Sequence, residues 1–511
     1  MSIALLSVFL IPTLSIPFVY LAGKKSPKAA AIFVALIALV NLALVLTTVP
    51  TVLNSADHRY IEPYNWIEPP VLKASFTLFV DGISVSIAII SLILIFAAAI
   101  FSINYMEGKK NLPSYYALLC MLSVGLVGVF ITSNLLLFYF CWELMLVPAY
   151  FIIGGWGYRD SYKAAFKFFL FTHAGAVFVL LGIGAIYMVT GVTDMFEAQA
   201  ALMTASPDVV RWILIALTAG FAVKMAIVPV HMWLPDAHSE APATMSALLS
   251  GVIISAGAYA ILRLSLGTVF PAVMGTSFGV DFLHGLAIFG LISAFFGSLI
   301  ALVETDIKRL IAYSSIAHMG YIMFGLSLFP SNLAAGTAVL LASATAITGT
   351  VLHIISHAVS KGLFFLSAGA VMHQTETRDI REMGGLAAKM PVTAVSSTIA
   401  ALSIAGAPPF ACFISEFLIF VGAFQVIHSD GFYTLPTIFM LIATVLSLAY
   451  SLRFTSKVFL GQPKEEKEKE KKILDVPNYM KFALALLVVL VIIIGIYPTF
   501  FVNLIQTVQF G

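Results

Sequence analysis

Apolar segments long enough to cross a lipid bilayer recur along the whole of this 511-residue sequence. A membrane helix needs about 20 apolar residues, and residues 2–22 reach that length with no basic residue in front of them. We interpret residues 2–22 as a membrane helix, because the apolar core of a cleaved signal peptide is shorter. Only 10% of the residues are charged, against about 25% in soluble domains. The sequence therefore predicts an all-α polytopic membrane protein.

Proline, glycine and charged residues divide the sequence into about fourteen expected transmembrane spans. The two longest exceed what an unbroken helix needs to cross about 30 Å of hydrocarbon. We expect each of these two to tilt, to extend beyond the membrane or to contain a break. The expected spans are residues 2–22, 28–50, 74–103, 114–133, 135–154, 163–190, 209–229, 242–266, 282–303, 309–329, 334–372, 391–427, 433–459 and 480–504.

Basic residues gather in alternate loops between these spans. Positive charge marks the cytoplasmic side of a membrane protein, and the other loops hold only Arg59, Lys73 and Arg211. This register places both termini on the outer face of a cell membrane. We interpret the mixed-charge run 463–472 as a solvated loop or helix extension; a docking surface for a soluble partner is the less favoured alternative. The basic loops contain Lys24, Lys25, Lys28, Lys109, Lys110, Arg159, Lys163, Lys308, Arg309, Arg378, Arg381, Lys389 and the run from Arg453 to Lys481.

The three cysteines, Cys120, Cys141 and Cys412, are far apart and lie in apolar segments. Neither a CxxC pair nor a Cys/His pattern for an iron–sulfur cluster, structural zinc or haem occurs. We interpret the cysteines as small buried hydrophobic residues. We expect no cofactor and no resident metal in this chain, so any linked redox chemistry belongs to another subunit.

A carboxylate stands in the middle of the apolar stretch 138–155, at Glu143. A charged residue at the centre of a membrane helix costs roughly 2.5–3.5 kcal/mol on the translocon scale, so it needs a partner or a use. The proposed partner is Lys224, five residues before Pro229, a proline expected to break span seven. Such a buried pair can switch protonation as its separation changes. The alternatives are a hydrogen-bonded structural carboxylate and a static salt bridge.

A polar stripe follows one face of span eleven, where His353, His357 and Lys361 recur every four residues. Two histidines at this spacing can bind a metal. The face has no anionic ligand, however, and imidazole titrates near neutrality. We therefore favour a proton relay over a metal site. His318 in span ten either joins this relay or is structural.

Span twelve contains Pro408–Pro409, which must break the helix, followed by Glu416. The pattern resembles Phe221 and Lys224 beside Pro229 in span seven. Spans four to eight and nine to thirteen are accordingly interpreted as two five-helix repeats, inverted because five is odd. The expected organisation is a three-helix segment (1–113), a first repeat (114–266), a second repeat (282–459) and a charged loop with the last span (460–511).

The most distinctive segment is 231–251, HMWLPDAHSEAPATMSALLSG. Asp236, His238 and Glu240 cluster there beside the start of a helix. Asp236 or Ser239 is expected to cap that helix; the alternative is that the cluster forms the mouth of an ion path.

Several of these motifs closely resemble the antiporter-like subunits of respiratory complex I. The same family serves Mrp antiporters, membrane-bound hydrogenases and F(420)H(2) dehydrogenases. The resemblance covers spans four to thirteen. The glutamate at position 416 resembles the M-type subunit, since N-type and Mrp-type members usually have lysine at this position. The chain also lacks room for the lateral helix of the L-type subunit. The matching motifs are WEL in span five, WLPDAHSEAPATMSALLSG, KRLIAYSSIAHMGY (308–321) and HIISHAVSKGLFFLSAG (353–369).

The resemblance implies about fourteen helices, two inverted repeats and breaks in helices seven and twelve. It assigns a proton relay to Glu143, Lys224, His318, His353, His357, Lys361 and Glu416. It also implies H⁺ or Na⁺ as cargo, membrane partner subunits, and a soluble redox arm with iron–sulfur and flavin or nickel–iron sites. A gradient-driven Mrp-type antiporter subunit is the alternative, and a spacer that has lost transport is a third possibility.

One position departs from the family pattern. Its eighth helix commonly carries a lysine two residues before Ala/Gly-Ala-Tyr, and here the text IISAGAYAILR places Ser255 there. We expect Ser255, Tyr259 or His238, with water, to link Lys224 to the central relay in its place.

Overall fold

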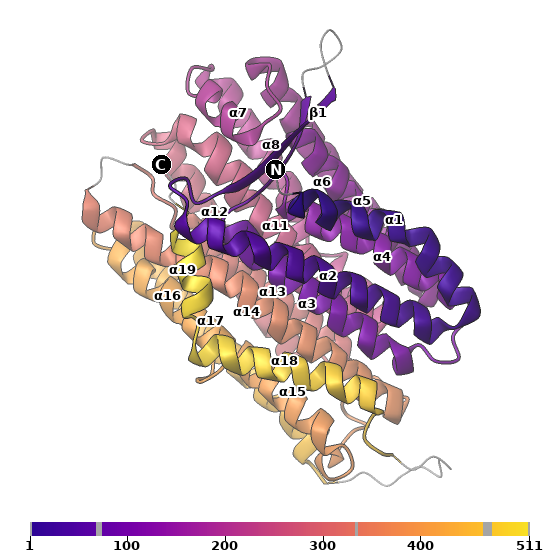
Figure 1. The fold of residues 1–511 in the computed structure, drawn as a ribbon. Helices are drawn as coiled ribbons and strands as arrows, with labels where there is room; N and C mark the ends of the chain where they lie inside the picture. Colours follow the sequence, from indigo (N-terminus) through magenta and orange to yellow (C-terminus); the bar gives the residue numbers. More distant parts are fainter. Residues whose placement is uncertain (1–2, 68–73, 333–335, 463–472, 509–511) are drawn as a thin grey trace.

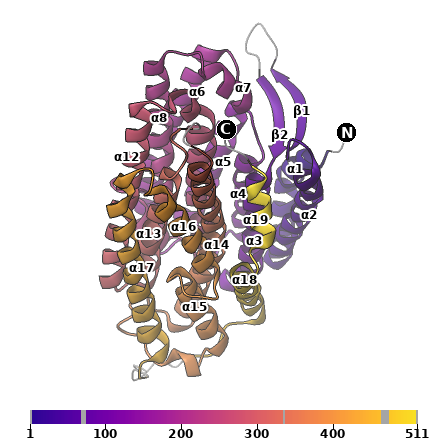
Figure 2. The same ribbon diagram turned by 90° about the vertical axis from the view of Figure 1, so that its left-hand side faces the viewer.

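A computed structural model describes residues 3–67, 74–332, 336–462 and 473–508. Long helices run side by side in a bundle, with one small β-hairpin at the end that also holds both termini (Figures 1 and 2). The opposite end carries the loops rich in lysine and arginine and is called the basic end below. The charged run 463–472 and Lys73 lie outside the described residues.

The N-terminal part consists of helices around the hairpin. Its elements are α1 (Ala4–Lys25), α2 (Pro27–Asn54), β1 (Tyr60–Ile67), β2 (Ala74–Val80), α3 (Gly82–Tyr105), α4 (Leu112–Phe130), α5 (Leu135–Trp156), α6 (Ser161–Thr190) and α7 (Met195–Leu202). The middle comprises α8 (Pro207–Met225), α9 (Leu234–Glu240), α10 (Ala243–Leu248), η1 (Leu249–Ile253), α11 (Ile254–Ala260), η2 (Ile261–Val269), η3 (Phe270–Val273), α12 (Ser277–Val303) and α13 (Ile307–Ser327). The last part has α14 (Thr337–Thr375), η4 (Leu386–Ala388), α15 (Pro391–Ile404), α16 (Ala411–Val426), η5 (Gly431–Tyr433), α17 (Thr434–Thr455), η6 (Ser456–Leu460), α18 (Asn478–Ile496) and α19 (Thr499–Gln506).

Twelve helical segments of the described part are long and apolar enough to cross a membrane, and α15 and α16 are shorter apolar helices. The fold class of an all-helical multi-pass membrane protein is confirmed. The total of fourteen spans stays a prediction.

The expected span 74–103 is wrong at its start, because residues 74–80 form β2 and pair antiparallel with β1. The helix begins only at Gly82, where the Asp81 carboxylate accepts hydrogen bonds from the amides of Ile83 and Ser84. An N-cap of this kind fixes the helix start. Neither the cap nor the hairpin was predicted from the sequence.

The longest helix, α14, passes unbroken through the middle of the bundle. Every residue from Ala346 to Met372 is buried, and α14 packs against α3, α10, α13, α15, α16 and α18. Of the three outcomes expected for this long segment, a break is therefore excluded. The polar stripe of α14 faces protein and not lipid.

Both predicted helix breaks are confirmed. Helix α8 ends at Met225, Ala226 adopts the left-handed conformation, and the Trp233 indole donates a hydrogen bond to the carbonyl of Val223 (2.9 Å). Helix α15 ends at Ile404, and Gly406 with φ +67° turns the chain before α16 begins at Ala411. In both cases proline interrupts the helical hydrogen bonds and leaves polar backbone inside the bundle.

The eighth expected span is more irregular than the sequence indicated. It consists of α10, the π-helical η1, α11, the π-helical η2 and the short 3₁₀ turn η3. Its apolar window is completely buried. π-Helical turns are rare and often occur at functional sites. Ser255, where the family pattern has a lysine, lies on α11 between the two π-helical segments.

Candidate functional site

Lys224 lies at the last turn of α8 and is 2% exposed. Its Nζ donates a hydrogen bond to the carbonyl oxygen of Trp142 (3.0 Å) and sits 3.9 Å from the centre of the Trp142 ring. Helix α11 packs closely against the end of α8 because Gly257 has no side chain; a Cβ there would lie only 2.8 Å from the amide nitrogen of Met225. The ammonium is thus held by a carbonyl dipole and an aromatic face.

The predicted direct pair between Glu143 and Lys224 is wrong for this structure. Glu143 instead accepts from His173 on α6, with 3.2 Å between Oε2 and Nδ1. The backbone carbonyl of Trp142 occupies the position at Lys224 that the carboxylate was expected to fill. The two charges remain close enough to interact electrostatically. His173 was missed, although a histidine within the apolar text FTHAG is the same kind of signal as Glu143.

In the second half, four helices bring polar side chains into direct contact. His318 of α13 lies 3.1 Å from His353 of α14 (Nδ1 to Nε2), and the other ring nitrogen of His353 lies 2.9 Å from the Ser415 hydroxyl of α16. Glu416 Oε1 is 3.9 Å from His318 Nδ1, and the Tyr450 hydroxyl of α17 is 3.4 Å from His318 Nε2. The structure therefore joins three predicted relay residues. Tyr450 and Ser415 were not anticipated.

Lys361 and His357 continue this cluster along α14. The Lys361 ammonium donates to the carbonyl of Ile311 (3.2 Å) and to the Ser314 hydroxyl. It is close enough to act electrostatically on all three relay histidines. Among the described residues neither ring nitrogen of His357 has a hydrogen-bond partner, so this imidazole makes no direct hydrogen bond to the other members of the cluster.

The break between α15 and α16 makes room for the Glu416 carboxylate. A Cβ at Gly406 would lie 2.4 Å from Glu416 Oε2. The left-handed backbone at this position also favours glycine. The helix break therefore positions the carboxylate beside His318 as well as turning the chain.

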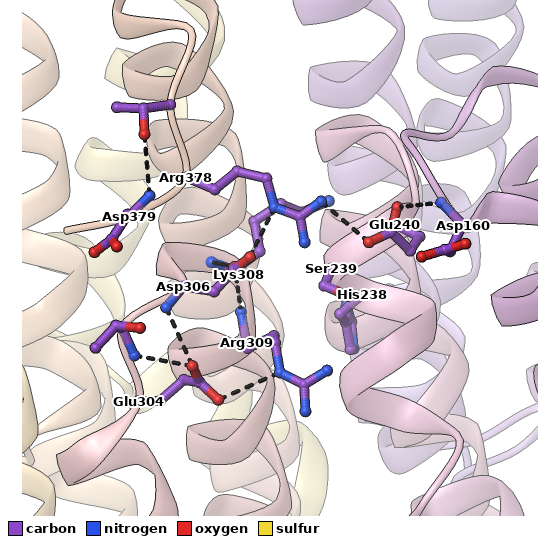
Figure 3. A network of polar contacts seen from close by, with 12 residues as sticks. Asp160, His238, Ser239, Glu240, Glu304, Asp306, Lys308, Arg309, Arg378 and Asp379 are labelled. Carbon is purple, nitrogen blue, oxygen red and sulfur yellow. Dashed lines mark hydrogen bonds and ion pairs between the residues drawn. The ribbon is translucent and has the colours of Figure 1, made fainter. Parts of the chain in front are cut away.

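A polar cavity of about 870 Å³ opens at the basic end; it is called the vestibule below. Arg378 spans it between Glu240 (3.1 Å) and Asp306 (2.7 Å), as Figure 3 shows. The carboxylates of Asp306 and Glu240 outweigh the effect of partial burial and raise the pKa of Arg378. The lining includes Tyr105, Lys109, Tyr158, Asp160, Glu240, Pro242, Asp306, His373, Glu376, Arg378 and Glu382.

His238 lies behind the vestibule, two residues before the lining residue Glu240 (Figure 3). Its ring is fully buried and stacks on Phe365 with 4.5 Å between centroids. Phe365 is the next member of the stripe that holds His357 and Lys361. Neither nitrogen of His238 has a hydrogen-bond partner in the described part of the chain. His238 interacts electrostatically with Lys308 and with Lys361, so it stands between the vestibule and the relay.

Helix capping by Asp236 or Ser239 is wrong, because the N-caps of α9 and α10 are Trp233 and Pro242, both without a side-chain hydrogen bond. Asp236 instead pairs with Lys167 (2.7 Å) and Arg309 (2.8 Å). Ser239 donates to the Asp236 carbonyl. The acidic cluster thus ties α6, α9 and α13 together, and the interpretation as the mouth of an ion path stays open.

Ser255 is completely buried on α11, and its hydroxyl has no hydrogen-bond partner among the described residues. Tyr259, the second expected link, hydrogen-bonds instead with Ser84 (3.0 Å) and the carbonyl of Phe130 (3.4 Å). It belongs to the buried group around the Asp81–Arg263 ion pair. Of the three expected links, His238 has the position that fits best.

Known proteins resemble this chain over most of its length. Residues 132–447 match the family model described as NADH:quinone oxidoreductase/Mrp antiporter, TM, and residues 66–116 match that of the complex I chain 5 N-terminus. The chain is 31% identical over 507 residues to NADH-quinone oxidoreductase subunit M of Rickettsia conorii, covering 98% of this chain and 96% of that protein.

Two further relatives belong to other kinds of complex. F(420)H(2) dehydrogenase subunit M of Methanosarcina mazei is 31% identical over 455 residues, covering 87% of this chain and 85% of that protein. A chain of the membrane-bound sulfane sulfur reductase, an archaeal respiratory membrane complex, superimposes with a TM-score of 0.82 at 27% identity, covering 97% of this chain and 76% of that one.

Proposed function

Because this chain belongs to the NADH:quinone oxidoreductase/Mrp antiporter family, we propose that it is a proton-translocating, antiporter-like membrane subunit of a redox-driven complex. The observation that carries the proposal is the buried contact of His318 with His353 beside Glu416 and Lys361. Ionisable groups in such close succession inside a membrane protein are costly and mark proton relays.

The proposed proton path starts at the vestibule and passes Lys308 and His238. It continues to Lys361, crosses the histidines of α13 and α14 and leaves through Glu416. Where side chains do not touch directly, water completes the steps, as in other polar cavities. The positive-inside rule places the basic end in the cytoplasm and both termini outside, in the plasma or inner membrane.

The proposed coupling element lies in the first half. Glu143 lies between two ionisable groups, His173 and Lys224, and its carboxylate can face either of them. Moving it towards Lys224 holds the proton there, and moving it away releases the proton. One proton crossing 100 mV requires about 2.3 kcal/mol, which corresponds to a change of one to two pKa units.

The partners are proposed from an exposed surface. Side chains of Glu143 and His173 are 24% and 48% exposed, although both lie on membrane-spanning helices. Lipid does not solvate such a pair, so a neighbouring membrane subunit is expected to cover it. A soluble arm with iron–sulfur and flavin or nickel–iron centres would then supply the energy.

The test replaces Glu143 or Lys224 by alanine in the complete complex, reconstituted in vesicles. Each variant should lower the rate of redox-driven proton uptake by at least about tenfold, the effect of roughly 1.4 kcal/mol on a transfer step. Lys25→Ala, at the end of α1, provides a lysine control that should pump normally. Undiminished uptake in both Glu143→Ala and Lys224→Ala would contradict the proposal.

The alternative of an Mrp-type sodium/proton antiporter subunit rests on the family model, which includes both kinds of complex. Purification of the native assembly separates the two. Iron–sulfur or flavin subunits in the preparation favour the redox complex. Small membrane subunits alone, with sodium-driven proton exchange in vesicles, favour the antiporter.

A separate prediction concerns the entry of the proton. His238→Gln should slow proton uptake by roughly tenfold or more, because glutamine preserves polarity but cannot exchange a proton. Free imidazole added to His238→Ala should restore part of the rate through the vestibule, which a purely structural role does not predict. His231→Gln is the matched control, since His231 packs against Phe296 outside this path. A normal rate in His238→Gln would move the entry elsewhere.

A further inference from the structure

The three groups that meet at the centre of the relay also resemble a metal-binding set. One nitrogen or oxygen from each of His318, His353 and Glu416 lies within 4.8 Å of the other two. All three side chains are buried. We propose that they form a binding site for a divalent transition-metal ion of the zinc class. Metal binding at these residues does not depend on the proposed function. Inhibition of transport by the bound metal does depend on it.

The distances suit a small tetrahedral ion. Bonds of about 2.0–2.1 Å to Zn²⁺ set neighbouring ligand atoms roughly 3.3 Å apart. The two imidazole nitrogens are already 3.1 Å apart, and Glu416 Oε1 is 3.9 Å from His318 Nδ1. A shift of the carboxylate by less than about 1 Å towards His318 would bring that pair to the tetrahedral spacing. The carboxylate is the flexible member of the set.

The outward-facing nitrogens of both imidazoles already have partners. His353 Nδ1 contacts the Ser415 hydroxyl at 2.9 Å, and His318 Nε2 lies 3.4 Å from the Tyr450 hydroxyl. Metal-binding histidines almost always use their second nitrogen in this way, which fixes the ring and the tautomer. The remaining nitrogen of each ring is the one that lies 3.1 Å from the other ring, where α13, α14 and α16 meet.

The composition of the set selects the class of ion. Two imidazoles and one carboxylate are the ligands of many zinc sites that keep a fourth position for water. Magnesium and calcium prefer oxygen ligands only. The α14 face by itself disfavours a metal, because it has no anionic ligand. Glu416 provides that ligand from α16, across the helix break.

A bound ion would compete directly with the transported proton. Metal ligands must be deprotonated, and the lone pairs that would bind the metal are those that the relay needs for proton transfer. Glu416 offers the way in, because its side chain is 8% exposed while that of His318 is fully buried. The expected consequence is inhibition of proton transport by added zinc, since metal binding and protonation exclude each other at these atoms.

The experiment titrates Co²⁺, which replaces Zn²⁺ and absorbs visible light when tetrahedral, into the full chain purified in detergent. The wild type should bind one equivalent with a visible absorption band that Zn²⁺ abolishes. His318→Gln, His353→Gln and Glu416→Gln should each weaken binding by at least about tenfold. His284→Gln removes a histidine paired with Asp430 at a different place (2.7 Å) and should bind Co²⁺ as the wild type does.

Absence of saturable Co²⁺ binding in the wild type would overturn the proposal, as would equal affinity in the three ligand variants. Zinc inhibition is measured separately in vesicles that contain the complete complex. Cobalt binding without zinc inhibition supports the site and counts against the relay. Normal proton transport without cobalt binding rejects the site alone.

Discussion

Lys361→Met is expected to abolish proton transport and leave the chain folded. Lys361 is completely buried, and its ammonium contacts the Ile311 carbonyl and the Ser314 hydroxyl. It interacts electrostatically with His238 on the entry side and with the relay histidines on the other. We infer that it takes the place of the lysine that the family pattern expects at Ser255. Methionine keeps a long flexible side chain without a proton to give.

Two further variants separate the effect of charge from that of proton transfer. Lys361→Arg keeps the charge but holds its proton permanently, so it should fail as Lys361→Met does. Ser255→Lys in the Lys361→Met background places an amine on α11, at the position where the family pattern has a lysine, and should recover part of the rate. The measurement is redox-driven acidification or alkalinisation in vesicles, with the losses expected at roughly 10²- to 10⁴-fold. Wild-type pumping in Lys361→Met would show that the proton bypasses α14.

The features predicted correctly from the sequence are those with a local cause. Proline removes a helical hydrogen bond wherever it stands, so the breaks near Pro229 and Pro408 followed from the text alone. The four-residue spacing of His353, His357 and Lys361 likewise determines one helix face. Rare ionisable residues in apolar segments indicated buried polar sites, because their cost in a membrane does not depend on the fold; the proton relay through them stays a prediction.

The features that were missed depend on neighbours far apart in sequence. Lys224 was expected to face a carboxylate but instead uses a backbone carbonyl, and every residue has one, so no sequence pattern identifies it. The meeting of Glu416 with His318 and His353 requires three helices, α13, α14 and α16, to be placed together. The π-helical turns of η1 and η2 leave no clear mark in the apolar text of span eight. The hairpin was missed for a different reason, since the aromatic and β-branched residues of β1 and the Asp81 cap were visible in the sequence.

Gly406→Ala is expected to stop proton exit almost as completely as Glu416→Gln does. Glu416→Gln removes the last group of the proposed path. Gly406→Ala leaves Glu416 in the sequence, but the new methyl group would lie 2.4 Å from Oε2. The carboxylate must then leave the position in which its Oε1 lies 3.9 Å from His318 Nδ1. A proton transfer that depends on this approach should slow by about 10² or more.

Backbone strain must be separated from this displacement, because alanine in the left-handed region costs roughly 1–2 kcal/mol. Gly191 offers the matched control. Its φ is +73°, close to the +67° of Gly406, and a Cβ there would meet nothing within 4 Å. Gly191→Ala should therefore lose similar stability in thermal unfolding and still pump at the wild-type rate. If Gly406→Ala pumps as well as Gly191→Ala, the position of the Glu416 carboxylate does not limit transport, and the exit must use another group.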